Sequence, residues 1–291
     1  MTSRIKIRPL SGVMGAEITG IDLNLLDDRI FGLINNAYLK HQVLCFRGQK
    51  LEPGAMVEFS ERFGKVLPHD NLKFTLKSHP KILVLSNDID RAGNQIGVID
   101  AGDAWHSDHQ FKAHPANCTI LYSLKNPSQG GQTDFANMYA AYEALPRKTK
   151  EKISGLRGCH SISKLKNKRV KISGAREGAV EFYKRQEMEI PDVEHPLVRT
   201  HPVTGRKSLY CSPRFTIGIK GDGVSEKDAA SLLDALIAQS IKKQFIYRHS
   251  WRDGDVVMWD NRCTNHRATG GYQYPDIRHI YRTTVEGEVT H

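Results

Sequence analysis

The sequence predicts a mostly β protein with flanking helices, built on a double-stranded β-helix (jelly-roll, cupin-like) core. Short apolar segments recur at even spacing along the 291-residue chain, separated by turns that contain Gly, Pro and Asp. This pattern is typical of antiparallel barrels and jelly rolls. Few segments have the apolar periodicity of a helix, and these flank or interrupt the strands. A chain of this length can bury a sizeable core, so we expect a single domain over residues 1–291.

Helices are expected in four segments. In 26–40, apolar residues follow helical spacing. The segment 53–63 begins with proline, a residue favoured in the first turn of a helix. A short helix is expected at 139–145, and a serine caps the last helix at 225–241.

Strands are expected over much of the remaining chain. Residues 1–26 predict short strands around glycines, and the apolar runs at 42–46 and 82–86 predict buried strands. A Pro-Val-Thr-Gly turn at 202–205 joins the two strands of a hairpin. The other strands are expected at 116–124, 132–137, 197–201, 207–211, 245–251, 255–259 and 278–285.

Two stretches lack a regular apolar pattern. Residues 68–103 contain a single predicted strand and lead directly into 105–108, so we expect them to form the rim of a site. Residues 160–190 are basic and contain glycine but little apolar periodicity. That composition is typical of a lid or an insertion.

The net charge of +10 is concentrated in one segment, because residues 147–185 contain thirteen Lys or Arg and only three Glu. Such a segment forms either a solvated surface or a region that steers an anionic substrate. Nucleic-acid binding would require aromatic residues among the basic ones for base stacking, and this segment has only Phe182 and Tyr183. We therefore expect no nucleic-acid partner.

The chain has the features of a soluble, cytoplasmic protein. Its five cysteines are scattered and form no CxxC motif, so we expect reduced thiols rather than disulfides or a zinc site. The first residues lack the apolar core of a signal peptide, and no apolar run approaches the length of a membrane span. We expect no membrane partner.

The sequence Trp105-His106-Ser107-Asp108 contains the most suggestive chemistry. We predict that it ends a strand, where alternate side chains point to the same side, so that an imidazole and a carboxylate face one metal ion. His266, after a later apolar run, is the candidate third ligand. Two histidines and one carboxylate leave metal positions open, as in non-haem Fe(II) oxygenases. The His-x-Asp triplet alone is weak evidence, because short motifs recur by chance.

Two further features strengthen this interpretation. Thr133, after two glycines, offers a hydroxyl to an anionic cosubstrate, although it also fits an ordinary turn followed by a strand. Arg278 lies within an apolar segment, and a buried guanidinium needs an anionic partner. The alternative is a surface strand with Arg278 and Arg282 facing water.

A set of motifs runs along nearly the whole chain, at 15–20, 105–108, 130–135, 140–145, 196–201 and 254–263 and at His266-Arg267. With these motifs the sequence resembles the TauD/TfdA family of Fe(II)- and 2-oxoglutarate-dependent dioxygenases. The likeness to the phenoxyacetate-type (2,4-D) members is greatest in Tyr247-Arg248-His249 and in the segments 196–201 and 259–263.

The resemblance implies specific roles for these residues. His106, Asp108 and His266 would hold the iron, and Thr133 and Arg278 would bind the distal carboxylate of 2-oxoglutarate. With O2, the reaction would yield succinate, CO2 and a hydroxylated substrate. The carboxylate of Asp108 favours hydroxylation, because halogenating relatives lack it. The family also implies a homo-oligomer, a dimer or a tetramer.

The substrate is expected to be a small organic anion such as an aryloxyalkanoate. Taurine, alkylsulfonates, alkyl sulfates and amino-acid derivatives are alternatives within the same family. The candidate substrate contacts are Arg282, His69, Phe111 and Arg214, with His109 as a further wall of the pocket. The resemblance places Arg282 near either the substrate anion or the cosubstrate. Each contact has a plainer alternative, since a histidine or arginine can face solvent and Phe111 can belong to the core.

Other residues are interpreted as structural. Trp105 is expected to pack against the ligand strand, and His160, His201 and His249 are expected to be structural or surface residues. Two other functions stay open. An oxygenase acting on nucleic acid would use the basic segment, and a non-catalytic barrel would bind a metal or small ligand without turning over 2-oxoglutarate.

Overall fold

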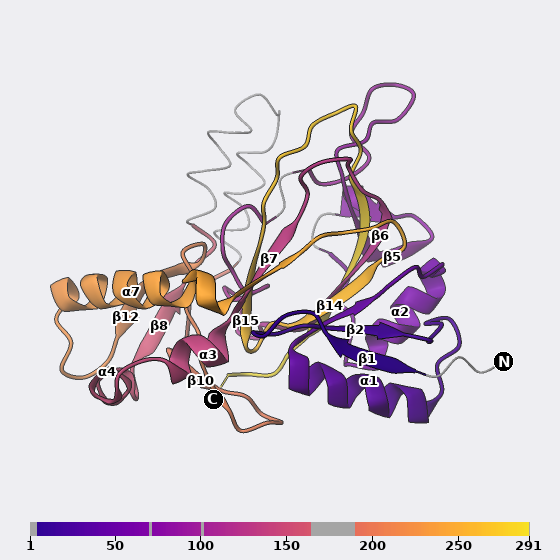
Figure 1. The fold of residues 1–291 in the computed structure, drawn as a ribbon. Helices are drawn as coiled ribbons and strands as arrows, with labels where there is room; N and C mark the ends of the chain where they lie inside the picture. The colour runs from indigo at the N-terminus through magenta and orange to yellow at the C-terminus, as the bar shows by residue number, and fades with distance from the viewer. Residues whose placement is uncertain (1–4, 70–71, 100–101, 164–189, 291) are drawn as a thin grey trace.

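Figure 1 shows the chain in a computed structural model, which describes residues 5–69, 72–99, 102–163 and 190–290. The segment predicted as a lid, 160–190, lies mostly outside the described residues. No helix in the described ranges combines the length and the hydropathy needed to cross a membrane.

An eight-stranded sheet dominates the fold, in the order β1-β2-β3-β14-β6-β16-β5-β4. All its pairs are antiparallel except β2 with β3. Its strands are Lys6–Pro9 (β1), Ala16–Thr19 (β2), Val43–Phe46 (β3), Thr75–Leu76 (β4), His79–Ser86 (β5), Ala116–Lys125 (β6), Val256–Asp260 (β14) and His279–Glu286 (β16).

A three-stranded sheet packs against this large sheet. It consists of β7 (Thr133–Asn137) between β13 (Ile246–His249) and β15 (Thr264–Ala268). Apolar side chains of both sheets, including Phe135 and Val257, form one buried cluster. Two facing antiparallel sheets closed around such a core form a jelly roll, so the predicted fold class is confirmed.

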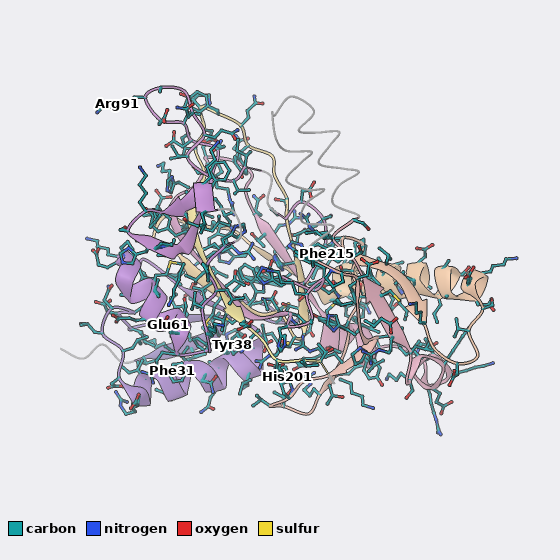
Figure 2. All side chains as sticks on the ribbon, turned by 180° about the vertical axis from the view of Figure 1, so that it is seen from behind. Phe31, Tyr38, Glu61, Arg91, His201 and Phe215 are labelled. Carbon is teal, nitrogen blue, oxygen red and sulfur yellow. The ribbon has the colours of Figure 1, made fainter. Side chains whose placement is uncertain are left out.

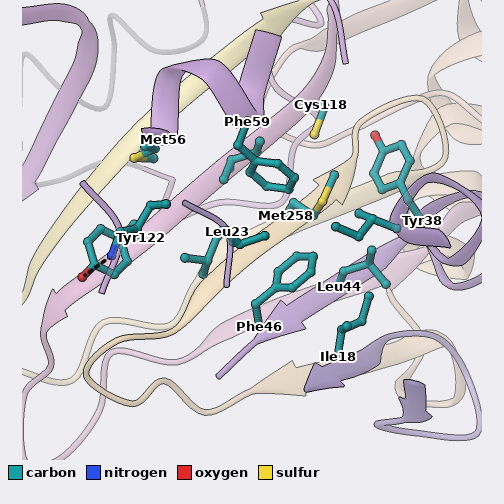
Figure 3. Close-up of a cluster of buried hydrophobic side chains, with 14 of the residues drawn as sticks. Ile18, Leu23, Tyr38, Leu44, Phe46, Met56, Phe59, Cys118, Tyr122 and Met258 are labelled. Carbon is teal, nitrogen blue, oxygen red and sulfur yellow. Dashed lines mark hydrogen bonds between the residues drawn. The ribbon is translucent and has the colours of Figure 1, made fainter. Parts of the chain in front are cut away.

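Helices α1 (Asp28–His41) and α2 (Pro53–Glu61) cover the other face of the large sheet. The Asp27 carboxylate accepts a hydrogen bond from the Ile30 N–H and thereby caps α1. Figure 3 shows Tyr38 of α1 and Phe59 of α2 packed over the sheet. Both predicted helices therefore form because one face of each is buried against strands.

A second group of elements extends to the left in Figure 1. It contains the sheet β12-β8-β9, the hairpin β10-β11 and three helices that pack on a separate apolar cluster. The bounds are Arg157–His160 (β8), Val193–Pro196 (β9), Val198–Thr200 (β10), Lys207–Leu209 (β11), Thr216–Lys220 (β12), Met138–Glu143 (α3), Arg147–Ile153 (α4) and Glu226–Ser240 (α7).

The strand predicted at 105–108 is wrong. Within that segment only His106 pairs, in a single β-bridge with His266. The sequence also did not predict β4, β8, β9, β12, β15 and α4. These strands are short, and β15 has the polar sequence Thr-Asn-His-Arg-Ala. It is a strand because its backbone pairs with β7, an interaction that no local pattern reveals.

Candidate active site

His106 and His266 face each other across their β-bridge. His106 N–H donates to His266 O at 3.0 Å, His266 N–H donates to His106 O at 2.8 Å, and the ring centroids lie 4.2 Å apart. His106 Nε2 is 3.5 Å from Asp108 Oδ1, and His266 Nε2 is 3.7 Å from Asp108 Oδ2. The structure thus brings together the three residues predicted as metal ligands, all buried.

The protonation states of these side chains suit a metal ion. Because the Ala104 carbonyl can only accept, His106 Nδ1 carries the proton of their 2.7 Å hydrogen bond and leaves a lone pair on Nε2. Burial lowers the pKa of both histidines. Burial alone would raise the pKa of Asp108, but the charge of Arg282 helps to hold it well below its usual value.

The donor set therefore fits a divalent metal. Neutral imidazoles and an ionised carboxylate are the forms in which these side chains bind metals. Their ligand atoms lie within 4.8 Å of one another.

Arg282 of β16 approaches the same carboxylate from another side. Its Nη2 lies 2.9 Å from Asp108 Oδ1. Arg282 also lines a pocket with His69, Lys81, His109 and Lys112, and none of the described lining residues is acidic. The predicted substrate contacts Arg282 and His69 thus share one basic pocket, and Arg282 connects it to the metal candidates.

Thr133 and Arg278 both lie near Trp251. The Trp251 indole N–H donates to Thr133 Oγ1 at 3.0 Å, and the Arg278 guanidinium lies 5.9 Å from the ring centroids of both Trp251 and Tyr272. Burial lowers the pKa of Arg278, and its Nε has no hydrogen-bond partner among the described residues.

These two side chains fit the distal carboxylate of 2-oxoglutarate. A buried guanidinium without an acid partner is costly, and a carboxylate matches its planar fork. The alternative of a surface strand is wrong for Arg278, which is 7% exposed. No sequence motif predicted a role for Trp251. The sequence shows only that an aromatic residue follows β13.

The other predicted substrate residues lie around the same centre. Phe111 packs on Phe215 at 4.9 Å between ring centroids, and Phe215, labelled in Figure 2, lies 5.8 Å from the His106 ring. Arg214 is buried and pairs with Asp103 at 3.0 Å. Arg214 therefore does not simply face solvent, and Phe111 belongs to a small apolar cluster beside the histidines.

The remaining predicted histidines are structural rather than surface residues. His160, His201 and His249 are all buried. His201 Nε2 lies 3.0 Å from Asp260 Oδ2, and Asp260 in turn binds Arg262. Trp105 is buried as expected, with the Arg267 guanidinium 4.8 Å from its ring centroid.

Cys45, His249 and Asp255 form a second buried group with metal-ligating atoms. Arg47 already pairs with Asp255, and burial raises the pKa of the Cys45 thiol. A protonated thiol opposes metal binding, and the three predicted metal ligands include no such thiol. We therefore interpret this group as a buried ion-pair cluster.

Comparisons with known proteins agree with this geometry. The model of the family described as "Taurine catabolism dioxygenase TauD, TfdA family" matches residues 6–284. The (S)-phenoxypropionate/alpha-ketoglutarate-dioxygenase of Sphingobium herbicidovorans is 32% identical over 92% of this chain and 91% of its own. An alkylsulfatase of Acinetobacter baylyi is 31% identical over 99% of this chain and 87% of its own.

A solved structure also matches nearly the whole chain. The crystal structure of AAD-2 in complex with Mn(II) and N-oxalylglycine superposes with a TM-score of 0.78 at 30% identity, covering 98% of both chains. Alpha-ketoglutarate is 2-oxoglutarate. The chain belongs to the TauD/TfdA family and is a 2-oxoglutarate-dependent dioxygenase.

Proposed function

We propose that this enzyme uses Fe(II) and 2-oxoglutarate to hydroxylate a small anionic substrate, an aryloxyalkanoate such as 2,4-dichlorophenoxyacetate, and so cleaves its ether bond. The observation that carries the proposal is the convergence of His106, Asp108 and His266, together with the buried Arg278. Two histidines and one carboxylate form the usual iron site of non-haem oxygenases.

Each residue of the centre has a role in this proposal. His106, Asp108 and His266 hold the iron, and Arg278 and Thr133 bind the distal carboxylate of 2-oxoglutarate. The Trp251 N–H already donates to Thr133 Oγ1. The threonine hydroxyl can therefore donate its own proton to that carboxylate. When bound, iron, 2-oxoglutarate and O2 supply the oxidation that converts a substrate C–H to C–OH, with release of succinate and CO2.

The substrate anion is assigned to the basic pocket that contains His69 and Arg282. Phe111 and Arg214 are assigned as further substrate contacts. Hydroxylation of the carbon that bears the ether oxygen gives a hemiacetal. The hydroxyl proton passes to the ether oxygen as the C–O bond breaks, so an aryloxyacetate yields a phenol and glyoxylate.

An alkyl sulfate is the second candidate substrate, and taurine, alkylsulfonates and amino-acid derivatives follow it. The alkylsulfatase is 31% identical to this chain and the phenoxypropionate enzyme 32%. A pocket lined by basic side chains would also accept a sulfate group.

A substrate panel distinguishes these candidates. Iron-loaded enzyme receives O2, 2-oxoglutarate and one compound of each class, and succinate and organic products are quantified against His106→Ala. We expect aryloxyacetates or aryloxypropionates to release phenol in step with succinate. Succinate formation stimulated only by alkyl sulfates would replace the first candidate with the second.

A further inference from the structure

The Asp108 carboxylate is held by a closed ring of hydrogen bonds that the proposed function leaves unused. Thr119 Oγ1 lies 2.6 Å from Asp108 Oδ2. Asn261 Nδ2 lies 3.0 Å from Thr119 Oγ1, and the Asp108 backbone N–H donates to Asn261 Oδ1 at 3.1 Å. All three side chains are at most 4% exposed.

The direction of each bond in this ring is fixed by chemistry. The Asn261 side-chain oxygen accepts from Asp108 N and also from the Trp259 indole N–H at 3.0 Å, so the amide orientation is determined from two sides. Its NH2 group must then donate to Thr119 Oγ1. The Thr119 hydroxyl proton is left to point at Asp108 Oδ2, since an ionised carboxylate only accepts.

The same asparagine is connected to the rest of the centre. Its backbone carbonyl accepts the Ser107 hydroxyl at 2.7 Å, and Ser107 lies between His106 and Asp108 in the chain. The Trp259 ring, whose N–H binds Asn261, contacts the His266 ring at 4.6 Å between centroids. One residue next to β14 therefore reaches the surroundings of every proposed metal ligand.

Arg282 competes with the metal site for the Asp108 carboxylate, and the ring of hydrogen bonds opposes this. Its guanidinium pairs with Asp108 Oδ1 at 2.9 Å, whereas the Thr119 hydroxyl binds Oδ2. The carboxylate is thus held between a cation on one oxygen and a neutral donor on the other. Without the hydroxyl, the carboxylate would be free to turn toward Arg282 and away from the histidines.

We propose that Asn261, acting through the Thr119 hydroxyl, is a positioning residue that fixes the Asp108 carboxylate in the orientation that binds the metal. This inference rests on the proposed function, because it takes Asp108 as a ligand. Neither residue touches substrate or cosubstrate in this account. Their effect is on metal affinity and not on the binding of 2-oxoglutarate.

The test compares Thr119→Val with Thr119→Ser in the full-length protein, stripped of metal and titrated with Mn(II). Valine keeps the shape of threonine but removes the hydroxyl, and serine keeps the hydroxyl. Loss of a partner that orients a metal ligand typically weakens metal affinity by about 10–100-fold. We expect a loss of this size in Thr119→Val, near wild-type affinity in Thr119→Ser, and an unchanged KM for 2-oxoglutarate at saturating metal.

Thr283→Val is the matched control, because Thr283 is equally buried and its hydroxyl lies 2.7 Å from Ser60 Oγ, on the other face of β16 from Arg282. It should bind Mn(II) like the wild type. Asn261→Ala, which leaves the Thr119 hydroxyl without its fixed direction, should also weaken Mn(II) binding and provides a second variant should Thr119→Val fail to fold.

The outcomes separate this inference from the proposed function. Folded Thr119→Val that binds Mn(II) as tightly as the wild type overturns the inference alone. Wild-type protein that binds Mn(II) no better than His106→Ala overturns the proposed function and, with it, this inference. A raised KM for 2-oxoglutarate with unchanged metal affinity would assign Thr119 to the cosubstrate and also overturn the inference.

Discussion

Arg278 shows how far a single residue could be interpreted from sequence. An arginine within an apolar segment suggested a buried cation in need of an anion, and the structure places it in the interior with Nε unpartnered among the described residues. Arg282 was harder to interpret, because its partner Asp108 is distant in the chain. Sequence indicates which side chains are unusual, whereas contacts between distant segments require the fold.

At this scale, Arg278→Ala tests the cosubstrate site. A hydrogen bond to a charged group contributes about 1.5–3 kcal/mol, so the KM for 2-oxoglutarate should rise roughly 10–100-fold while the protein remains folded. Steady-state kinetics with varied 2-oxoglutarate measures the effect. Arg206→Ala, which removes a surface arginine paired with Glu143, is the control, and an equal KM in both variants would contradict the assignment.

The indole N–H of Trp251 provides a second residue-scale prediction. Trp251→Phe removes the donor to Thr133 Oγ1 but keeps an aromatic ring near Arg278. A typical hydrogen bond contributes about 0.5–1.5 kcal/mol, so we expect the KM for 2-oxoglutarate to rise roughly 2–10-fold. Trp105→Phe, at a buried tryptophan in a different cluster, should leave that KM unchanged. A KM for Trp251→Phe equal to that of the wild type would show that the indole N–H does not orient Thr133.

At the scale of elements, the backbone before β7 packs closely against the backbone after β15, where Gly130-Gly131 meets Gly270-Gly271. Gly130 and Gly131 precede Thr133 and adopt positive φ, and Gly131 N–H donates to Gly270 O at 2.7 Å. A Cβ on Gly130 would lie 2.4 Å from the Gly271 carbonyl oxygen. The close approach of the two backbones therefore requires glycine at this position.

Gly130→Ala should consequently lower both stability and 2-oxoglutarate binding. Positive φ costs an L-residue about 1–2 kcal/mol, and the clash with Gly271 adds to that cost and displaces Thr133. Gly270→Ala is the control, because Gly270 has φ +66° but no heavy atom within 4 Å of its Cβ position. Thermal unfolding and the KM for 2-oxoglutarate measure the effects; equal losses in both variants would leave only backbone strain as the cause.

Helices and strands were predicted well where the apolar pattern of the segment itself indicates the conformation. The amphipathic helices α1, α2 and α7 and the apolar strands of the large sheet were all expected from periodicity. Among the failures listed with the fold, two concern the candidate site: β15 and the segment 105–108, whose conformations come from pairing with distant segments. The site lies where these two failures meet, since His106 and His266 belong to them.

At the scale of the whole molecule, buried histidines make stability depend on pH. Burial lowers the pKa of His195 to about 4, while its Nε2 donates to the Lys112 carbonyl and Nδ1 accepts from Thr290. The unfolded chain gains a proton on this residue near its usual pKa of about 6.5, but the folded chain does not. The stabilisation is therefore complete above about pH 6.5 and is lost as the pH falls toward 4.

Urea unfolding at two pH values tests this contribution. Between pH about 7.5 and about 5, the free energy of unfolding should fall by about 2 kcal/mol through His195, and His195→Gln should lose that part of the decrease. His114→Gln, at an exposed histidine, should behave as the wild type. The same pH dependence in His195→Gln and the wild type would show that His195 does not titrate on unfolding.

The fold class followed from strand spacing and the family resemblance, because both are properties of the whole chain. The predicted dimer or tetramer and the cytoplasmic location stay predictions, since neither follows from one chain. Substrate identity depends on a few pocket side chains, and relatives whose names state different substrates are 32% and 31% identical to this chain.

We propose that His106, Asp108 and His266 form the metal centre of 2-oxoglutarate turnover. The decisive measurement is of succinate formed from 2-oxoglutarate by wild type, His106→Ala and Asp108→Ala, each iron-loaded without O2 and then exposed to it. We predict O2-dependent succinate in the wild type and none above background in either variant, with unchanged circular dichroism. Succinate formed at wild-type rates by a folded variant would contradict the claim.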